Sequence, residues 1–250
     1  SLTGLRFTSG RQDIEMLAGE LLPEAIVLPK KLSLELAFYG MLNAFRTAAE
    51  IESSFGDLQL SVQLDSDETF SGRFSTGDFD LGQLLADTAM FGPLALTAEM
   101  TGSGVDRDNF TATVLADLSK LTLNNYLYRD IHLDGTFGDQ LFEGQVGLKD
   151  ENLVVDFDGL VNLRSGEEHY RFRLDLQGAG LQQLNFTEDD IRIGLVAEAD
   201  VRGTPDNLQG RFDLSDITAA REEQLFVLDS LSADFTNTPG CSEVLISSKL

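Results

Sequence analysis

The side chains that could act in catalysis or bind a metal are few and far apart in this sequence. There are two histidines, His132 and His169, and each falls on the polar side of an alternating segment or in a loop. A metal site or a catalytic base needs partners such as a cysteine or a second histidine nearby. Neither histidine has such a neighbour in the sequence, so we expect both to be surface residues.

Paired carboxylates are the second candidate for chemistry. Asp156 and Asp158 fall on one face of an alternating segment, and Asp189 is adjacent to Asp190. Two carboxylates that flank a sugar are the usual machinery of glycoside hydrolysis. In a chain with 42 acidic residues, however, such pairs arise by chance. We therefore predict no catalytic residue and expect that the protein is not an enzyme.

Ligand-binding loops are also poorly supported. The acidic turns at 65–68 and 106–108 lack the spacing of known calcium-binding loops, so solvated turns are the better interpretation. Gly102-Ser-Gly104 lies in a predicted hairpin loop, whereas a phosphate-binding loop follows a strand and opens a helix. Cys241 lies beside a turn and reads as an ordinary residue rather than a nucleophile. We predict no metal ion and no cofactor.

The composition excludes several classes of partner. The formal net charge is −24, from 42 acidic against 18 basic residues. Nucleic acids and anionic membrane surfaces are bound mainly through Lys and Arg, so neither is expected here. The absence of tryptophan weakens the case for carbohydrate stacking. No apolar run is long enough to cross a membrane as a helix.

A long internal repeat organises the chain. The stretch 70–137 resembles 170–237, so that Leu81-Gly-Gln-Leu84 recurs as Leu181-Gln-Gln-Leu184. Fixed long periods are typical of arrays whose units bury their apolar faces only against neighbours. We predict a poorly assigned N-terminal β segment (1–69), a first repeat unit (70–169) and a truncated second unit (170–250), joined in one continuous β-groove.

Period-two alternation between the turns predicts strands in most of the chain. Leu2–Phe7 could be a strand, whereas Ile14–Leu22 and Phe45–Ser53 suit either a helix or a strand. Asp80 is a suitable N-cap for a short helix over 81–86, and a shorter copy is expected at 181–184. Most connections have two to six residues, which is too short for parallel crossovers, so the pairing should be antiparallel and mostly sequential.

The alternation places apolar side chains on one face of this meander and charged side chains on the other. The predicted apolar lining comprises Leu96, Ala98, Val114, Ile131, Leu133, Val146, Leu148, Leu153, Val155, Phe157, Val161, Phe172, Leu174, Leu176, Ile191, Ile193, Leu195, Phe212 and Leu214. A twisted sheet of roughly fifteen strands cannot stay flat, because neighbouring strands rotate by about 20°. It could close as a barrel, split into a sandwich, or curl into an elongated open trough. Repetition without capping segments favours the trough, in an all-β fold with one or two short helical turns.

Three stretches carry a resemblance to a known family. They are Leu115–Phe137, the run from Leu141-Phe-Glu-Gly144 through Asn152–Gly159, and Asp206–Ile217. They resemble the AsmA-like and TamB proteins of Gram-negative bacteria, and are most similar to the large TamB-like proteins of the Bacteroidota type. The resemblance implies a β-taco-like groove in a periplasmic protein that is tethered to the inner membrane. It also implies phospholipid transport toward the outer membrane, or a role in outer-membrane biogenesis.

The resemblance and the residues lead to the same first hypothesis, a bridge-like lipid-transfer segment. Its partners would be phospholipid or another acyl-chain lipid, the rest of a longer chain that includes the membrane anchor, and an outer-membrane protein. The alternative is a β-rich surface or adhesion module with a closed core and no lipid conduit. A polysaccharide-active β-helix is a third option, which the hairpin loops contradict. A purely structural spacer is the fourth.

Overall fold

The computed structural model describes residues 2–10, 26–106, 109–204, 206–222, 224–238 and 241–249. The protein is all-β, with 74% of its residues in strands and 2% in helix. The strands of its single sheet are β1 (Leu2–Gly10), β2 (Lys31–Met41), β3 (Ala44–Ser53), β4 (Gly56–Leu64), β5 (Thr69–Asp80), β6 (Phe91–Ser103), β7 (Thr111–Leu123), β8 (Tyr126–Tyr128), β9 (Ile131–Gly138), β10 (Leu141–Lys149), β11 (Leu153–Asn162), β12 (His169–Gly180), β13 (Ile191–Arg202), β14 (Leu208–Arg221), β15 (Gln224–Thr238) and β16 (Cys241–Lys249). The helix of the described part is α2 (Leu81–Leu84).

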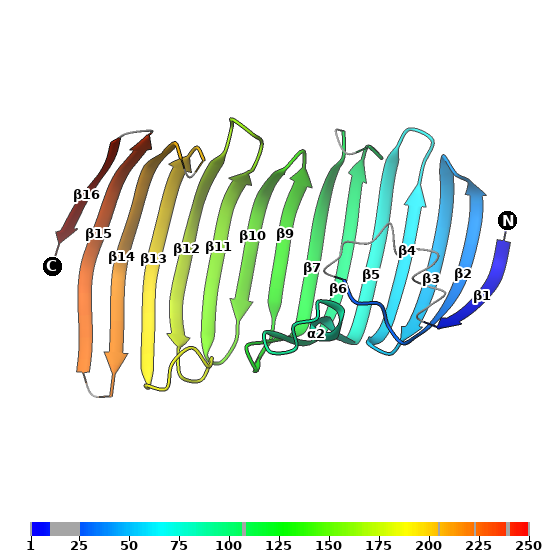
Figure 1. Cartoon of the computed structure of the whole chain (residues 1–250), viewed down its shortest axis with the longest axis horizontal. Coiled ribbons are helices and arrows are strands. Elements are labelled where there is room, and N and C mark those ends of the chain that lie inside the picture. The colour runs from blue at the N-terminus through cyan, green and yellow to red at the C-terminus, as the bar shows by residue number, and fades with distance from the viewer. Residues whose placement is uncertain are drawn as a thin grey trace. The chain divides into compact units, whose positions relative to one another are not determined.

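The sheet follows the chain from one end to the other. Its order is β1 to β7 and then β9 to β16, and the short strand β8 pairs with β7 beside this path (Figure 1). Within the described residues β1 and β16 end the order without pairing with each other, so the sheet is not closed. The predicted all-β antiparallel meander, open rather than closed as a barrel, is thereby confirmed.

Two uncertain segments of the sequence now have an outcome. The suggested strand at Leu2–Phe7 is β1, and the ambiguous segment Phe45–Ser53 is strand β3. The segment Ile14–Leu22 lies outside the described residues. Alternation could not decide Phe45–Ser53 because alanine and glutamate suit helices, but pairing with two neighbouring strands overrides that weak local preference.

By their contacts the residues form two compact units, Ser1–Ile131 and His132–Leu250. The predicted divisions at 69/70 and 169/170 rest on sequence likeness and stay a prediction. Strand ends do recur at the same interval, because β5 and β12 each have 12 residues and begin at Thr69 and His169. Each of these two strands is also bulged at the equivalent point, between Thr76 and Phe79 in β5 and between Leu176 and Ala179 in β12.

The segments that follow these two strands differ in one capping residue. Asp80 caps α2, because its Oδ1 atom accepts a hydrogen bond of 2.9 Å from the backbone N–H of Gln83. The helix ends at Leu84, short of the predicted Ala86, whose φ of +56° no longer fits a helix. In the second copy Gly180 takes the place of Asp80 and has no side chain to cap with. Residues 181–184 accordingly form hydrogen-bonded turns rather than a helix.

Several buried large side chains lie near these segments, at the ends of the strands. In the first unit Phe55 and Phe79 pack edge to face with ring centroids 6.4 Å apart, and both are 8% exposed. In the second unit Leu184 is 1% exposed. Figure 1 shows α2 at the lower ends of β5 and β6. Each unit therefore has a small packed core at the end of its strands that carries the helix or turn.

Candidate functional site

The strand register assembles the predicted apolar lining of the second unit into continuous rows. One row runs across β10 to β15 through the Cα partners Val146, Phe157, Leu174, Ala197, Leu214 and Leu231. A neighbouring row joins Leu148, Val155, Leu176 and Leu195. Because directly paired residues of antiparallel strands point to the same side, these rows form one apolar face.

The remaining lining residues of this unit join the same face. Phe172 and Phe212 flank Ala199 in a third row, Val161 pairs with Tyr170, and Ile193 pairs with Ala179, which in turn pairs with Leu153. Ile191 lies two residues before Ile193 on the same strand and pairs with Arg221. Leu133 alternates with the exposed residues His132 and Asp134 in β9.

The first unit has an equivalent apolar face on β5 to β7. Ala98 pairs with Phe74 on one side and with Ala116 on the other. Leu96 lies in the adjacent row, and Val114 belongs to the next one, opposite Met100. Ile131 is half-buried at the start of β9. The 19 predicted lining residues thus lie on the expected strands and, where pairing is defined, in shared rows.

The depth of burial is the property that makes this face unusual. Of the predicted lining only Leu148 is buried, at 8% exposed, and every other member is half-buried. The buried apolar residues of the described strands are instead mostly alanines, such as Ala112, Ala197 and Ala199. Side chains between two packed sheets would be almost fully enclosed. The half-burial therefore indicates that no second layer covers this face in the described part of the chain.

Glycines shape the apolar surface, because phenylalanine rings lie over them. A Cβ atom on Gly135 would stand 2.5 Å from Cε2 of Phe142, and one on Gly159 would stand 2.9 Å from the ring atom Cζ of Phe157. On the first unit the ring of Phe70 covers Gly102 in the same way. The sequence signal for these pairs was present, since glycines occupy apolar positions of the alternation. The sequence does not predict the orientation of the rings, which lie along the sheet over the glycines instead of projecting away from it.

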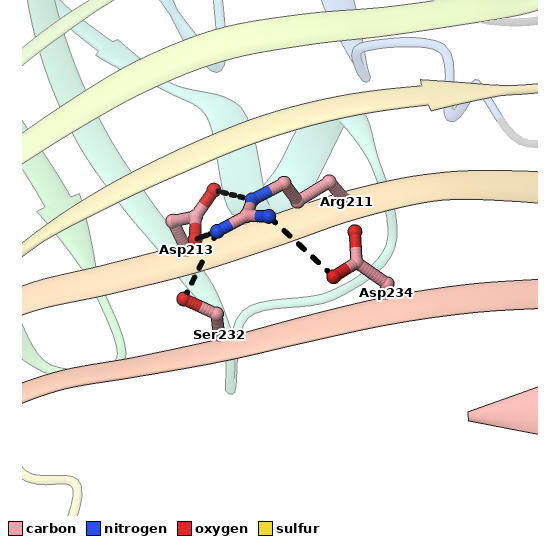
Figure 2. A network of polar contacts seen from close by, with 4 residues as sticks. All are labelled: Arg211, Asp213, Ser232 and Asp234. Atoms are coloured by element: carbon pink, nitrogen blue, oxygen red, sulfur yellow. Dashed lines mark hydrogen bonds and ion pairs between the residues drawn. The ribbon is translucent and has the colours of Figure 1, made fainter. Parts of the chain in front are cut away.

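The opposite face carries rows of charged side chains in which most neighbours have opposite charge. Across β12 to β15 the Cα partners Arg171, Asp200, Arg211 and Asp234 follow one another, and a parallel row contains Asp158, Arg173, Glu198 and Asp213. Arg211 is the centre of a network: its Nε donates to Asp213 Oδ2 at 2.6 Å, and its other nitrogens reach Ser232 and Asp234 (Figure 2). Cross-strand pairs of this kind favour one register over its neighbours.

Two carboxylates on this charged face have lowered pKa values. The hydrogen bond from Arg211, followed by one from Ser232, lowers the pKa of Asp213. The hydrogen bond with His169, whose Nε2 lies 2.8 Å from Asp200 Oδ1, lowers the pKa of Asp200. Both groups are therefore held in the charged form, as structural ion-pair partners.

Open hollows also lie on the charged face, which the sequence did not predict. One hollow of the second unit has a volume of about 680 Å³ and extends from Asp134 on β9 to Asp213 on β14. A smaller one of about 360 Å³ in the first unit is lined by Arg46, Gln63 and Arg73. The hollows lie between the long ion-paired side chains of this face. Charged and polar side chains form most of the lining of the hollow in the second unit, so we assign no acyl-chain binding to it. The lining of the hollow in the first unit also includes apolar side chains, among them Val62 and Met100.

The residues that were considered for chemistry are not assembled into a site. His132 is exposed on β9, and His169 forms a hydrogen bond with Asp200. Asp156 and Asp158 are exposed on the charged face of β11, and Asp189 pairs with Arg221. Within the described residues no group of three or more His, Cys, Asp or Glu side chains is arranged to hold a metal ion. The acidic turn at 106–108 and the Cys241 side chain fall partly or wholly outside the described structure.

The apolar face is thus the best-formed candidate site. No helix in the described ranges is long and apolar enough to cross a membrane. No family model matches the chain, and no curated protein and no solved structure is significantly similar to it.

Proposed function

We propose that the apolar face binds the acyl chains of phospholipid, and that the chain is a lipid-transfer segment of an AsmA-like or TamB-like protein. In this proposal the segment belongs to a periplasmic bridge that is tethered to the inner membrane by the rest of a longer chain. It would carry lipid toward the outer membrane, where an outer-membrane protein would be its partner. The segment performs no catalysis and needs no cofactor.

The half-burial of the lining carries this proposal. Rows of Leu, Val, Ile and Phe continue over β10 to β15 and remain open enough for an additional apolar layer. Each methylene of an acyl chain that these rows shield from water would stabilise the complex by about 0.8 kcal/mol. Since every row offers only apolar side chains and no polar anchor, no single position would hold the acyl chain much more tightly than the next. Such a surface supports movement along the sheet.

The alternative of a surface or adhesion module with a closed core fits this observation less well. A filled interior would enclose Phe157, Leu174 and Leu195 completely, whereas all three are half-buried. The charged face does resemble a solvated protein surface, and both hypotheses accommodate it.

Polar substitutions on the lining test the proposal. Val155→Asp, Leu174→Asp and Ile193→Asp should abolish uptake of a fluorescent fatty-acid probe, while the circular dichroism spectrum keeps its β signature. The matched control is Leu160→Asp, because Leu160 is a half-buried residue of β11 that pairs with Glu143 and Arg171 on the charged face. Probe uptake should be unchanged in this control. Global unfolding of the three lining variants alone would indicate a closed core and contradict the proposal.

A further inference from the structure

The hollow on the polar face of the first unit has no role in the proposed lipid binding. Its volume is about 360 Å³, which lies at the lower end of the range of about 300–1,000 Å³ for small-molecule sites. The strand register places its polar side chains in two neighbouring rows. One row contains Arg46, Gln63, Ser71 and Thr101, and the other contains Ser61, Arg73 and Glu99.

The two units each have a hollow around the same repeated ion pair. Arg73 pairs with Glu99 across β5 and β6, and Arg173 pairs with Glu198 across β12 and β13. Each pair belongs to the lining of the hollow in its own unit. The two hollows are therefore equivalent places of the repeat and can be compared residue by residue.

The positions next to this pair are charged in the second unit and carry hydroxyl groups in the first. The second-unit residues are Asp158, Arg171 and Asp200, and the first-unit residues at the same places in the register are Ser61, Ser71 and Thr101. These three hydroxyl groups make no side-chain hydrogen bond within the described part of the chain. The first hollow thus has free donors where the second has charges.

Arg46 adds a positive charge that is not neutralised by an ion pair. The other charged residues of the lining are Arg73 and Glu99, which pair with each other. Among the described residues none forms an ion pair with the exposed Arg46 side chain. The nearby carboxylate of Asp65 accepts hydrogen bonds of 3.1 and 3.0 Å from the Gln63 amide. In a chain of net charge −24, this hollow combines an available guanidinium group with hydroxyl donors.

We propose that this hollow binds the phosphate group of a small soluble phosphate monoester, with Arg46 as its main contact. A guanidinium group matches two phosphate oxygens at once, and the hydroxyls of Ser71 and Thr101 can donate to the remaining oxygens. The hollow lies on the face opposite to the apolar lining. A lipid whose acyl chains lie on the apolar face therefore has its headgroup on the other side of the sheet. The phosphate site does not depend on the proposed lipid binding.

Equilibrium dialysis against radiolabelled glycerol 3-phosphate, at constant ionic strength, tests the site in the 250-residue chain. Binding should be saturable, and inorganic phosphate should compete. Arg46→Gln should weaken binding by about tenfold or more, because a hydrogen bond to a charged group is lost. The matched control is Arg171→Gln, which removes the same charge from the equivalent hollow of the second unit and should leave binding unchanged. Equal weakening by the two substitutions would show a general effect of charge and overturn the site.

The repeat itself supplies a second test. Thr101→Asp introduces the carboxylate that the second unit has as Asp200, and it should abolish binding by repelling the phosphate group. Thr101→Val removes the hydroxyl group alone and should weaken binding less. The Arg46 and Thr101 side chains are exposed, so these variants are expected to fold, and circular dichroism checks this. Undiminished binding by Thr101→Asp would contradict the proposal.

A short-chain lipid distinguishes a soluble ester from a headgroup as the source of the phosphate. Dihexanoylphosphatidic acid carries the same phosphate monoester and should compete no better than glycerol 3-phosphate. Much tighter binding of this lipid, lost in Arg46→Gln, would overturn the assignment to a soluble ester. No saturable binding of either compound or of inorganic phosphate would overturn the site altogether.

Discussion

The ring of Phe142 lies over Gly135, so that a Cβ atom on this glycine would stand 2.5 Å from the ring carbon Cε2. Gly135 is buried although it has no side chain, because the ring covers it. Phe142 also packs against Phe137, with ring centroids 4.8 Å apart. On this apolar face the aromatic rings therefore lie along the sheet, next to residues with little or no side chain.

Gly135→Ala should consequently destabilise the protein. The added methyl group forces the Phe142 ring out of place, and overpacking of this kind costs about 1–3 kcal/mol. Urea unfolding should show the loss, and Phe142→Leu in the same chain should recover most of it. Gly178→Ala is the matched control, since a Cβ atom there would meet nothing within 4 Å. Equal destabilisation at 135 and 178 would show that the ring contact is unimportant.

Leucine truncations should distinguish the packed strand ends from the open face. Leu184 is 1% exposed, and its replacement by alanine should cost about 2–5 kcal/mol because it leaves a cavity. Leu174 is half-buried in the lining, so Leu174→Ala should cost clearly less. Thermal or urea unfolding of the two variants measures the difference. Equal losses would mean that the lining is a closed core.

The Arg211–Asp213 pair should contribute stability that depends on pH. The folded protein lowers the pKa of Asp213, so its contribution is complete above the ordinary aspartate pKa of about 3.9 and is lost as the pH falls through the lowered value. Asp213→Asn should therefore destabilise the protein at pH 7, and the difference in stability should shrink as the pH falls through the lowered pKa. Because Asp213 is partly exposed, the loss at pH 7 should be small, within about 1 kcal/mol.

The control for this experiment is Glu151→Gln, which removes one negative charge from an exposed loop position. In a chain of net charge −24 that change should reduce repulsion and leave stability equal or slightly higher. A loss for Asp213→Asn that does not shrink as the pH is lowered would show that packing, rather than the ion pair, is responsible.

Alternation was enough to predict the strands and their faces, because side chains alternate sides in every strand. The alternating residues Leu58, Leu60, Val62 and Leu64 belong to β4, and the predicted lining residues of β11 to β14 share rows of the sheet. Alternation does not predict how deeply each side chain is buried, however. It assigns Leu174 and Ala197 to one face, but whether a second layer covers them depends on segments far away in the sequence.

Local chemistry explains the finer differences from the sequence prediction. The predicted copy of α2 lacks a helix because Gly180 replaces the capping carboxylate of Asp80. The short strand β8 was not predicted; Asp130, with a φ of +51°, separates it from β9. The corresponding strand of the second unit, β15, runs unbroken over 15 residues. A positive φ at a single aspartate is tolerated by many sequences and leaves too weak a signal to predict.

The hollows of the charged face have a similar explanation. In the strand register Arg171, Arg173 and Arg211 lie behind the apolar rows, on the charged face that the alternation predicts. The conformations of these arginine side chains and of their ion-pair partners determine where a hollow remains. Those conformations depend on neighbouring residues from several different strands. Such combinations have no counterpart in a local sequence pattern.

Quenching of a single tryptophan by brominated acyl chains tests most directly whether lipid lies on the apolar face. The sequence contains no tryptophan, so Leu174→Trp and Leu160→Trp each place one reporter, on the apolar and on the charged face of the same sheet. Phosphatidylcholine brominated on its acyl chains should quench strongly at position 174 and weakly at position 160. Equal quenching at both positions, or none at 174 in a folded protein, would contradict acyl-chain binding by this face.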